Sequence, residues 1–199
     1  MIFKGERKLL LPGFSDPVLE SQRSFRILLE AMSHPGRVFP LEVGMKVPEP
    51  LHIAAAALAL ALLDFDTPLW TDLAPDSEAA NWIRFHSGCP LAEDPFSGRF
   101  GLITGDCGLS LMSRFHPGLD EFPEESATVI IQVAGLVFGN GKKLTGPGIE
   151  KEHYLAVEGL PEDFWGAWKA NHHLYPLGVD VILTTWLELA ALPRTTRVE

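Results

Sequence analysis

The densest group of cations and hydroxyls in the chain is Arg194-Thr195-Thr196-Arg197. Two guanidinium groups and two hydroxyls suit the oxygens of a phosphate or phosphonate, because each can donate hydrogen bonds to an anion. The same residues could bind a partner protein, or they could form an ordinary solvated basic tail. Pro193 restricts the backbone before them, which favours a defined segment. We therefore treat these four residues as candidates for anion or partner binding, with the solvated tail as the alternative.

A second candidate is the segment Gly146-Pro147-Gly148. Proline followed by glycine is typical of the two central positions of a type II turn. Backbone N–H groups of a turn can form a concave anion site, which makes Gly146 and Gly148 candidates for phosphate binding. Neither a P-loop lysine nor a clear helix start follows, so a plain structural turn leading into Ile149 is the favoured interpretation.

Other familiar chemistry lacks a matching pattern. A pyridoxal phosphate site needs a lysine of lowered pKa beside a phosphate site, and no lysine has that context in the sequence. The pair His172-His173 has no cysteine or carboxylate at metal-ligand spacing. No Gly-x-Ser-x-Gly elbow occurs either. We therefore expect no cofactor and no metal, and we assign no catalytic residue.

Composition narrows the class of protein. The chain has 199 residues, is 46% hydrophobic and carries a formal net charge of −10. Nucleic-acid binding needs clustered cations, so this class is not expected. The apolar run at 51–63 is shorter than the roughly 20 residues of a membrane span. Two cysteines without ligand spacing suit a reducing compartment. We expect a cytoplasmic protein with one domain over 1–199, or two closely packed lobes, and treat 1–14 as an extension that could be flexible.

The apolar spacing predicts helices that alternate with buried strands. The first helix should begin at Asp16, a good N-cap, and end at His34-Pro35-Gly36. Gly139-Asn140-Gly141 predicts a hairpin turn, because Asn-Gly readily adopts positive φ. The other expected helices cover 51–63, 77–85 and 161–172, and the expected strands cover 69–70, 99–104, 128–134 and 179–185. This order predicts an α/β three-layer sandwich with a mixed sheet.

Several segments together resemble the H subunit of the bacterial carbon–phosphorus lyase core complex, a family of phosphonate metabolism proteins. They are QRSFRILLEAMSHPG at 22–36, LLDFDTPLW at 62–70, RFHSGCPL at 84–91, ESATVIIQVAGL at 125–136, LTGPGI at 144–149, YPLGVDVILT at 175–184 and LPRTTRV at 192–198. Each is weak alone, but their common order makes the match specific.

The resemblance implies a fold similar to pyridoxal-phosphate-dependent transferases without that cofactor. It also implies a homodimer in isolation and assembly with the G, I and J subunits. That system forms ribose 1-methylphosphonate 5-triphosphate from ATP and a phosphonate. The aromatic residues Phe164, Trp165 and Trp168 on one helix support the dimer, since they could exceed what one core face buries. The alternative function is a stand-alone enzyme for a phosphorylated small molecule, with Arg194 and the Gly146 turn at its site.

Overall fold

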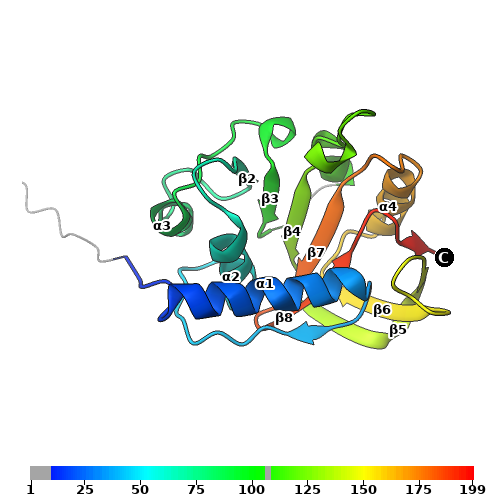
Figure 1. The fold of residues 1–199 in the computed structure, drawn as a ribbon, viewed down its shortest axis with the longest axis horizontal. Helices are drawn as coiled ribbons and strands as arrows, with labels where there is room; N and C mark the ends of the chain where they lie inside the picture. Colours follow the sequence, from blue (N-terminus) through cyan, green and yellow to red (C-terminus); the bar gives the residue numbers. More distant parts are fainter. Residues whose placement is uncertain (1–9, 106–108) are drawn as a thin grey trace, which may run out of the picture.

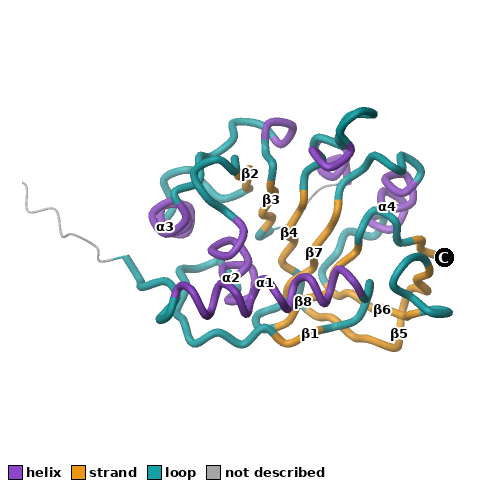
Figure 2. The backbone as a smooth tube through the Cα atoms, viewed as in Figure 1, coloured by secondary structure: helices purple, strands orange, loops and turns teal. Residues whose placement is uncertain are grey.

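The centre of the fold is a six-stranded mixed sheet with the strand order β1-β8-β7-β4-β3-β2 (Figures 1 and 2). A computed structural model describes residues 10–105 and 109–199. Strands β2, β3, β4 and β7 run parallel, whereas β8 is antiparallel to both β7 and β1. The strands are β1 Phe39–Pro40, β2 Leu69–Thr71, β3 Phe100–Ile103, β4 Thr128–Gln132, β7 Asp180–Thr184 and β8 Glu188–Leu192. The predicted α/β class with a mixed sheet is confirmed.

Both faces of this sheet are buried. Ile130 and Ile182 belong to one hydrophobic cluster, whereas Ile131 and Leu183 belong to the other. A strand covered on both sides needs apolar residues at successive positions, which explains the nearly continuous apolar runs in β4 and β7.

Helices α1 (Pro17–Ser33), α2 (Ile53–Leu62) and α3 (Glu78–Ser87) contribute to the cluster on one face. The predicted start of α1 is confirmed, because the Asp16 side chain accepts a hydrogen bond of 3.0 Å from the Leu19 N–H. Residues 54–59 of α2 are buried, and their small alanines let α2 pack closely against α1. Among the described residues, no helix is long and apolar enough to cross a membrane.

The opposite face is covered by α4 (Phe164–His172) and a three-stranded sheet of the order β6-β5-β9. These strands are β5 Gly135–Thr145, β6 His153–Glu158 and β9 Arg197–Val198. Short 3₁₀ helices, η1 Pro95–Ser97, η2 Leu109–Arg114 and η3 Pro123–Glu125, lie in the connections. The second covering layer therefore includes strands β6 and β9, which the sequence patterns did not predict.

The predicted hairpin turn at Gly139-Asn140-Gly141 is wrong. Residues 135–145 form one strand, and Phe138 and Lys142 both pair with Leu155 of β6, so residues 139–141 form a bulge between them. Gly139 and Gly141 do adopt positive φ, at 85° and 88°. The predicted positive φ of the glycines is correct, but β-bulges use this conformation as well as turns do.

The aromatic residues of α4 lie in the core. Phe164 and Trp168 are 4% and 0% exposed, and Trp165 packs against the same cluster. The sequence-based argument that these aromatic residues exceed what one core can bury is therefore wrong. The homodimer itself stays a prediction, and α4 does not supply its interface through Phe164 or Trp168.

Residues 10–14 pack against the helical side of the molecule. The backbone carbonyl of Leu11 accepts a hydrogen bond of 2.8 Å from the Trp82 indole. The side chains of Leu10, Leu11 and Phe14 contact the hydrophobic cluster. The remaining part of the expected N-terminal extension, residues 1–9, lies outside the described residues.

The β5 bulge yields a first prediction. A Cβ added to Gly141 would lie 2.5–2.7 Å from backbone atoms of Leu155 and Ala156, whereas one added to Gly139 would meet nothing within 4 Å. Gly139→Ala should lower the free energy of unfolding by about 1 kcal/mol, the cost of positive φ. Gly141→Ala should lower it by about 3 kcal/mol, because the added methyl group also clashes with backbone. Denaturant unfolding measures both, and equal losses would contradict the bulge geometry.

Candidate functional site

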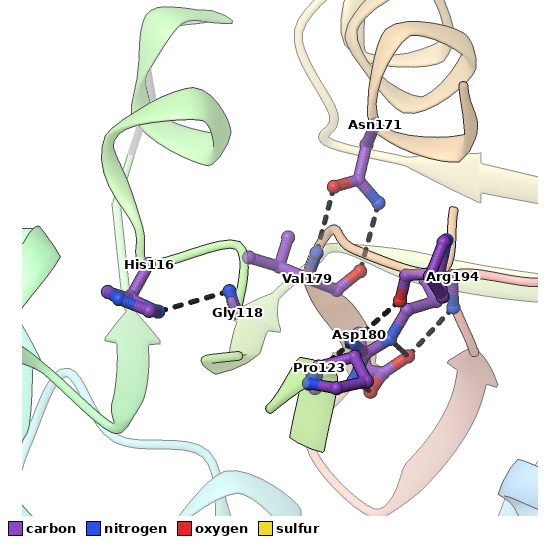
Figure 3. Close-up of polar contacts among 8 residues, drawn as sticks. His116, Gly118, Pro123, Asn171, Val179, Asp180 and Arg194 are labelled. Carbon is purple, nitrogen blue, oxygen red and sulfur yellow. Dashed lines mark hydrogen bonds and ion pairs between the residues drawn. The ribbon is translucent and has the colours of Figure 1, made fainter. Parts of the chain in front are cut away.

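Arg194 and Asp180 form a largely buried ion pair (Figure 3). The guanidinium Nη2 lies 2.7 Å from Asp180 Oδ2, and Nε lies 3.3 Å from Oδ1. The backbone N–H of Arg194 donates to Oδ1 of the same carboxylate at 2.7 Å. Both side chains are 15% exposed. One carboxylate therefore fixes both the side chain and the backbone of Arg194.

The sheet explains this pairing. Asp180 is the first residue of β7, and Val181 pairs with Leu192 at the end of antiparallel β8. Arg194 follows two residues later, so its backbone lies beside the start of β7. Its Nη1 also donates to the carbonyl oxygens of Pro123 and Pro176, at 2.8 and 3.4 Å. The guanidinium thus joins three connecting segments, and these bonds use all three of its nitrogens.

The residues after Arg194 form a tight turn. The Thr196 N–H donates to the Pro193 carbonyl at 2.8 Å. Thr196 is buried, and its carbonyl oxygen accepts a hydrogen bond of 2.9 Å from the Trp168 indole. The PRTTR segment is therefore ordered against α4, as the proline suggested. Thr196 faces the core and is not placed to meet a ligand from solvent.

The predicted type II turn is confirmed. The Ile149 N–H donates to the Gly146 carbonyl at 3.1 Å, and Gly148 has φ of +81°. Gly148 lies against the backbone oxygen of Ser33, where an added Cβ would clash. Gly146 instead lies next to Thr195. A Cβ added to Gly146 would lie 2.9 Å from the Thr195 carbonyl oxygen.

A cavity of about 280 Å³ lies between the two candidate segments. Its lining includes Gly146, Thr195 and Arg197 from the sequence-based set, because Thr145 of β5 pairs with Arg197 of β9. The other lining residues are Pro147, His172 and Tyr175. The structure therefore brings three of the candidates together, and it places Arg194, Thr196 and Gly148 in structural contacts.

His172 and Tyr175 are not among the site residues predicted from the sequence. His172 Nδ1 lies 2.9 Å from the Arg194 carbonyl oxygen, so Nδ1 carries a proton and the ring is held at the cavity. Tyr175 follows the helix and is 59% exposed. The only sequence signal was the position of both residues just before the strand that begins at Asp180.

The cavity suits an oxyanion. Arg197 is exposed, and the structure gives its guanidinium no ion pair within the described ranges. The Thr195 hydroxyl and the Tyr175 phenol add neighbouring donors. A cation with several donors can bind a phosphate or phosphonate by charge-assisted hydrogen bonds.

Metal and thiol chemistry receive no support from the parts of the chain that the structure describes. There, no group of three potential His, Cys, Asp or Glu ligands could hold a metal ion. Cys89 is buried, and burial raises the pKa of its thiol, which makes the reactive thiolate less available. Cys107 lies outside the described residues.

Comparisons with known proteins define the family. Residues 12–199 match the model of the bacterial phosphonate metabolism protein family PhnH. The chain is 36% identical to the PhnH subunit of alpha-D-ribose 1-methylphosphonate 5-triphosphate synthase from Rhizobium meliloti, over 94% of each chain. It is also 36% identical to the putative C-P lyase subunit protein HtxG from Stutzerimonas stutzeri, over 89% of this chain and 85% of that protein. The chain belongs to the PhnH family.

The buried ion pair yields a stability prediction. Arg194→Ala should lower the free energy of unfolding by about 3 kcal/mol, because it leaves the Asp180 carboxylate without its cation. Arg194→Lys should lose less, since one ammonium keeps the charge but not the forked contacts. Lys142→Ala, at an exposed position, should stay within about 0.5 kcal/mol of the parent protein. Unaltered denaturant unfolding of Arg194→Ala would show that the pair is not stabilising.

Proposed function

We propose that this protein is a subunit of a carbon–phosphorus lyase system that supports formation of ribose 1-methylphosphonate 5-triphosphate from ATP and a phosphonate. The observation that carries the proposal is the family match over 12–199. The support extends to a relative named as a subunit of that synthase, aligned over 94% of both chains. The function belongs to phosphonate breakdown, and the enzyme is the assembled complex.

The partners proposed are the G, I and J subunits, in the cytoplasm, with a homodimer when the chain is isolated. An exposed apolar stripe supports a protein partner. On α1, Val18, Leu19, Phe25 and Leu29 are 76, 62, 43 and 51% exposed. Neighbouring apolar side chains on an exposed helix are typical of surfaces that another protein covers. The fold proposed is similar to that of pyridoxal-phosphate-dependent transferases, used here without the cofactor.

Within this function, the role proposed for the cavity beside Arg197 is to hold an oxyanion such as a phosphate or phosphonate group. The stand-alone enzyme alternative placed Arg194 at the same site. Because Asp180 and two carbonyl groups already bind the Arg194 guanidinium, this alternative loses its principal anion ligand. Arg197 takes its place as the candidate to test, and the subunit role is the one we adopt.

If the cavity binds an anion, substitutions of Arg197 and Arg194 should have different effects. In a strain without its own copy, Arg197→Ala should impair growth on methylphosphonate as sole phosphorus source while the level and melting temperature of the protein stay normal. It should weaken methylphosphonate binding by about tenfold or more, because a charge-assisted bond contributes roughly 1.5–3 kcal/mol. Arg194→Ala should impair growth through a matching loss of folded protein.

Lys142→Ala is the control. Lys143 is less suitable as a control position, because its ammonium group forms an ion pair with Glu199. Arg197→Lys should recover part of the binding, since it restores the charge without the fork. Normal growth and unchanged calorimetric binding in Arg197→Ala would refute the anion role.

Assembly provides an independent test of the subunit function. The tagged chain should co-purify with the G, I and J proteins when all four are expressed together. The four-protein complex should consume ATP and methylphosphonate, and the isolated chain should not. Turnover by the isolated chain would overturn the subunit proposal in favour of a stand-alone enzyme.

A further inference from the structure

An apolar cavity of about 350 Å³ lies between α4 and the segment around η2. Its walls include Met112, Phe115, Ala167, Ala170, Leu174 and Val179. Positions 167, 170 and 171 have the spacing of one helical face, so α4 presents small side chains to the cavity. Among the described residues, this cavity shares no lining residue with the candidate anion site, so the two are separate.

The floor of the cavity is held in place by hydrogen bonds. The Asn171 side chain accepts a bond of 2.8 Å from the Val179 N–H and donates one of 2.9 Å to the Val179 carbonyl (Figure 3). Both residues line the cavity and are buried, as is Phe115. Because Asn171 uses both ends of its amide within the protein, the floor offers a fixed apolar shape. Such a preformed cavity can receive an apolar group at little conformational cost.

Two loops beside the cavity are joined by hydrogen bonds. Pro117, which lines the cavity, accepts a bond of 2.8 Å from the Gly178 N–H. Arg194 joins the same loops through the carbonyl oxygens of Pro123 and Pro176. The loop that leads into η3 and the loop that follows α4 therefore lie side by side at the amino end of β7.

Both loops expose large apolar side chains. Leu119 and Phe122 are 44 and 51% exposed, and Leu174, which also lines the cavity, is 51% exposed. A hollow with apolar side chains at its rim is typical of a surface that another protein covers. Protein interfaces place their strongest contacts where an apolar anchor of one partner fills such a hollow in the other.

The charge beside the cavity is negative. The loop into η3 and η3 itself carry four exposed carboxylates, Asp120, Glu121, Glu124 and Glu125. Within the described ranges, none of the four forms an ion pair. Of the neighbouring cations, Arg114 ends η2, Lys169 lies on the side of α4 away from the cavity, and Arg197 lines the other cavity. Carboxylates in this excess attract a positively charged partner.

We propose that the surface formed by this apolar cavity and the residues 117–125 binds a basic protein segment, which inserts one large apolar side chain into the cavity. An apolar cavity of about 150 Å³ can hold a benzene ring, so this larger cavity has room for a phenylalanine or leucine side chain. Lysine or arginine residues on either side of that anchor would meet the carboxylates of 120–125. The proposed function leaves this surface unassigned, and the test below does not need the lyase proteins.

The test measures binding of short fluorescent peptides to the full chain by fluorescence anisotropy. The central residue of each peptide is phenylalanine, leucine or serine, and its flanks carry lysine and arginine, glutamate or serine. Basic peptides with a phenylalanine or leucine centre should bind more tightly by about tenfold or more than the basic serine-centred peptide, because only they bury an apolar side chain. They should also bind more tightly than the acidic peptides, and added salt should weaken them.

Methionine methyl NMR locates the bound peptide. Met112 lines the cavity, whereas Met32 and Met45 contact the hydrophobic cluster on the other face of the sheet. The basic phenylalanine-centred peptide should shift the Met112 methyl signal, assigned by its absence in Met112→Leu. The signals of Met32 and Met45 should stay in place.

A cavity variant tests the anchor. Ala170→Phe, at an exposed position of α4, fills the mouth of the cavity and should weaken the basic phenylalanine-centred peptide by about tenfold or more. Lys169→Phe places the same ring away from the cavity and removes a cation, so it should bind the peptide at least as tightly as the parent protein. Equal melting temperatures establish that both variants are folded.

A charge variant tests the flanks. Glu121→Gln combined with Glu124→Gln should weaken the basic peptides and leave the serine-flanked peptides unchanged. The matched control, Glu42→Gln with Asp66→Asn, removes the same charge at exposed positions elsewhere and should bind like the parent protein.

Several outcomes would overturn the proposal. They are no binding by any basic peptide, binding that ignores the central residue or the flanking charge, and unchanged binding in Ala170→Phe. A Met112 shift with indole but with no peptide would show a small-molecule cavity instead. A Met112 shift that depends on protein concentration alone would show that a second copy of the chain covers the surface.

Discussion

The buried pair between Arg194 and Asp180 is the interaction on which the C-terminal part of the fold depends. A carboxylate that is 85% covered is stable in its charged form only when a cation and hydrogen-bond donors compensate it, and Arg194 supplies both. The pair fixes the turn that follows, which places Thr196 under the Trp168 indole and leads the chain into β9. The pairing of β9 with β5 then holds Arg197 beside the Gly146 turn.

The two ends of the central sheet therefore have different roles. At the amino end of β7, the Asp180–Arg194 ion pair holds connecting segments together, and the exposed Arg197 lines the nearby cavity. At the carboxyl ends of β3 and β4, neutral groups are held by hydrogen bonds to Gln132 and Asp72. The exposed Arg197 is a local positive charge in a protein of net charge −10, and this charge is the basis of the proposed anion site.

Local physical chemistry made much of the fold predictable. Asp16 followed by Pro17 specifies a helix start, because the carboxylate caps an unsatisfied N–H and proline costs nothing at the first position. The apolar runs of β4 and β7 specify strands buried on both faces. Proline and glycine in Gly146-Pro147-Gly148 specify a type II turn. These features depend on residues within a few positions of one another, so the sequence alone was sufficient, and its motifs also identified the family.

Other features depend on partners that are distant in the sequence. Gly139 and Gly141 require positive φ in a turn and in a bulge alike, and only Leu155 on β6 makes the segment a bulge. The sequence shows the cationic group at 194–197. Whether the Arg194 guanidinium binds a ligand or Asp180 depends on the antiparallel pairing of β7 with β8. Likewise, Gln132 and Trp186 reach His52 only through the tertiary structure. The sequence by itself determined the local conformations, the buried strands and the family. The tertiary structure decided which polar groups are used within the protein and which remain available to a ligand, because each hydrogen-bonding group can satisfy only a few partners.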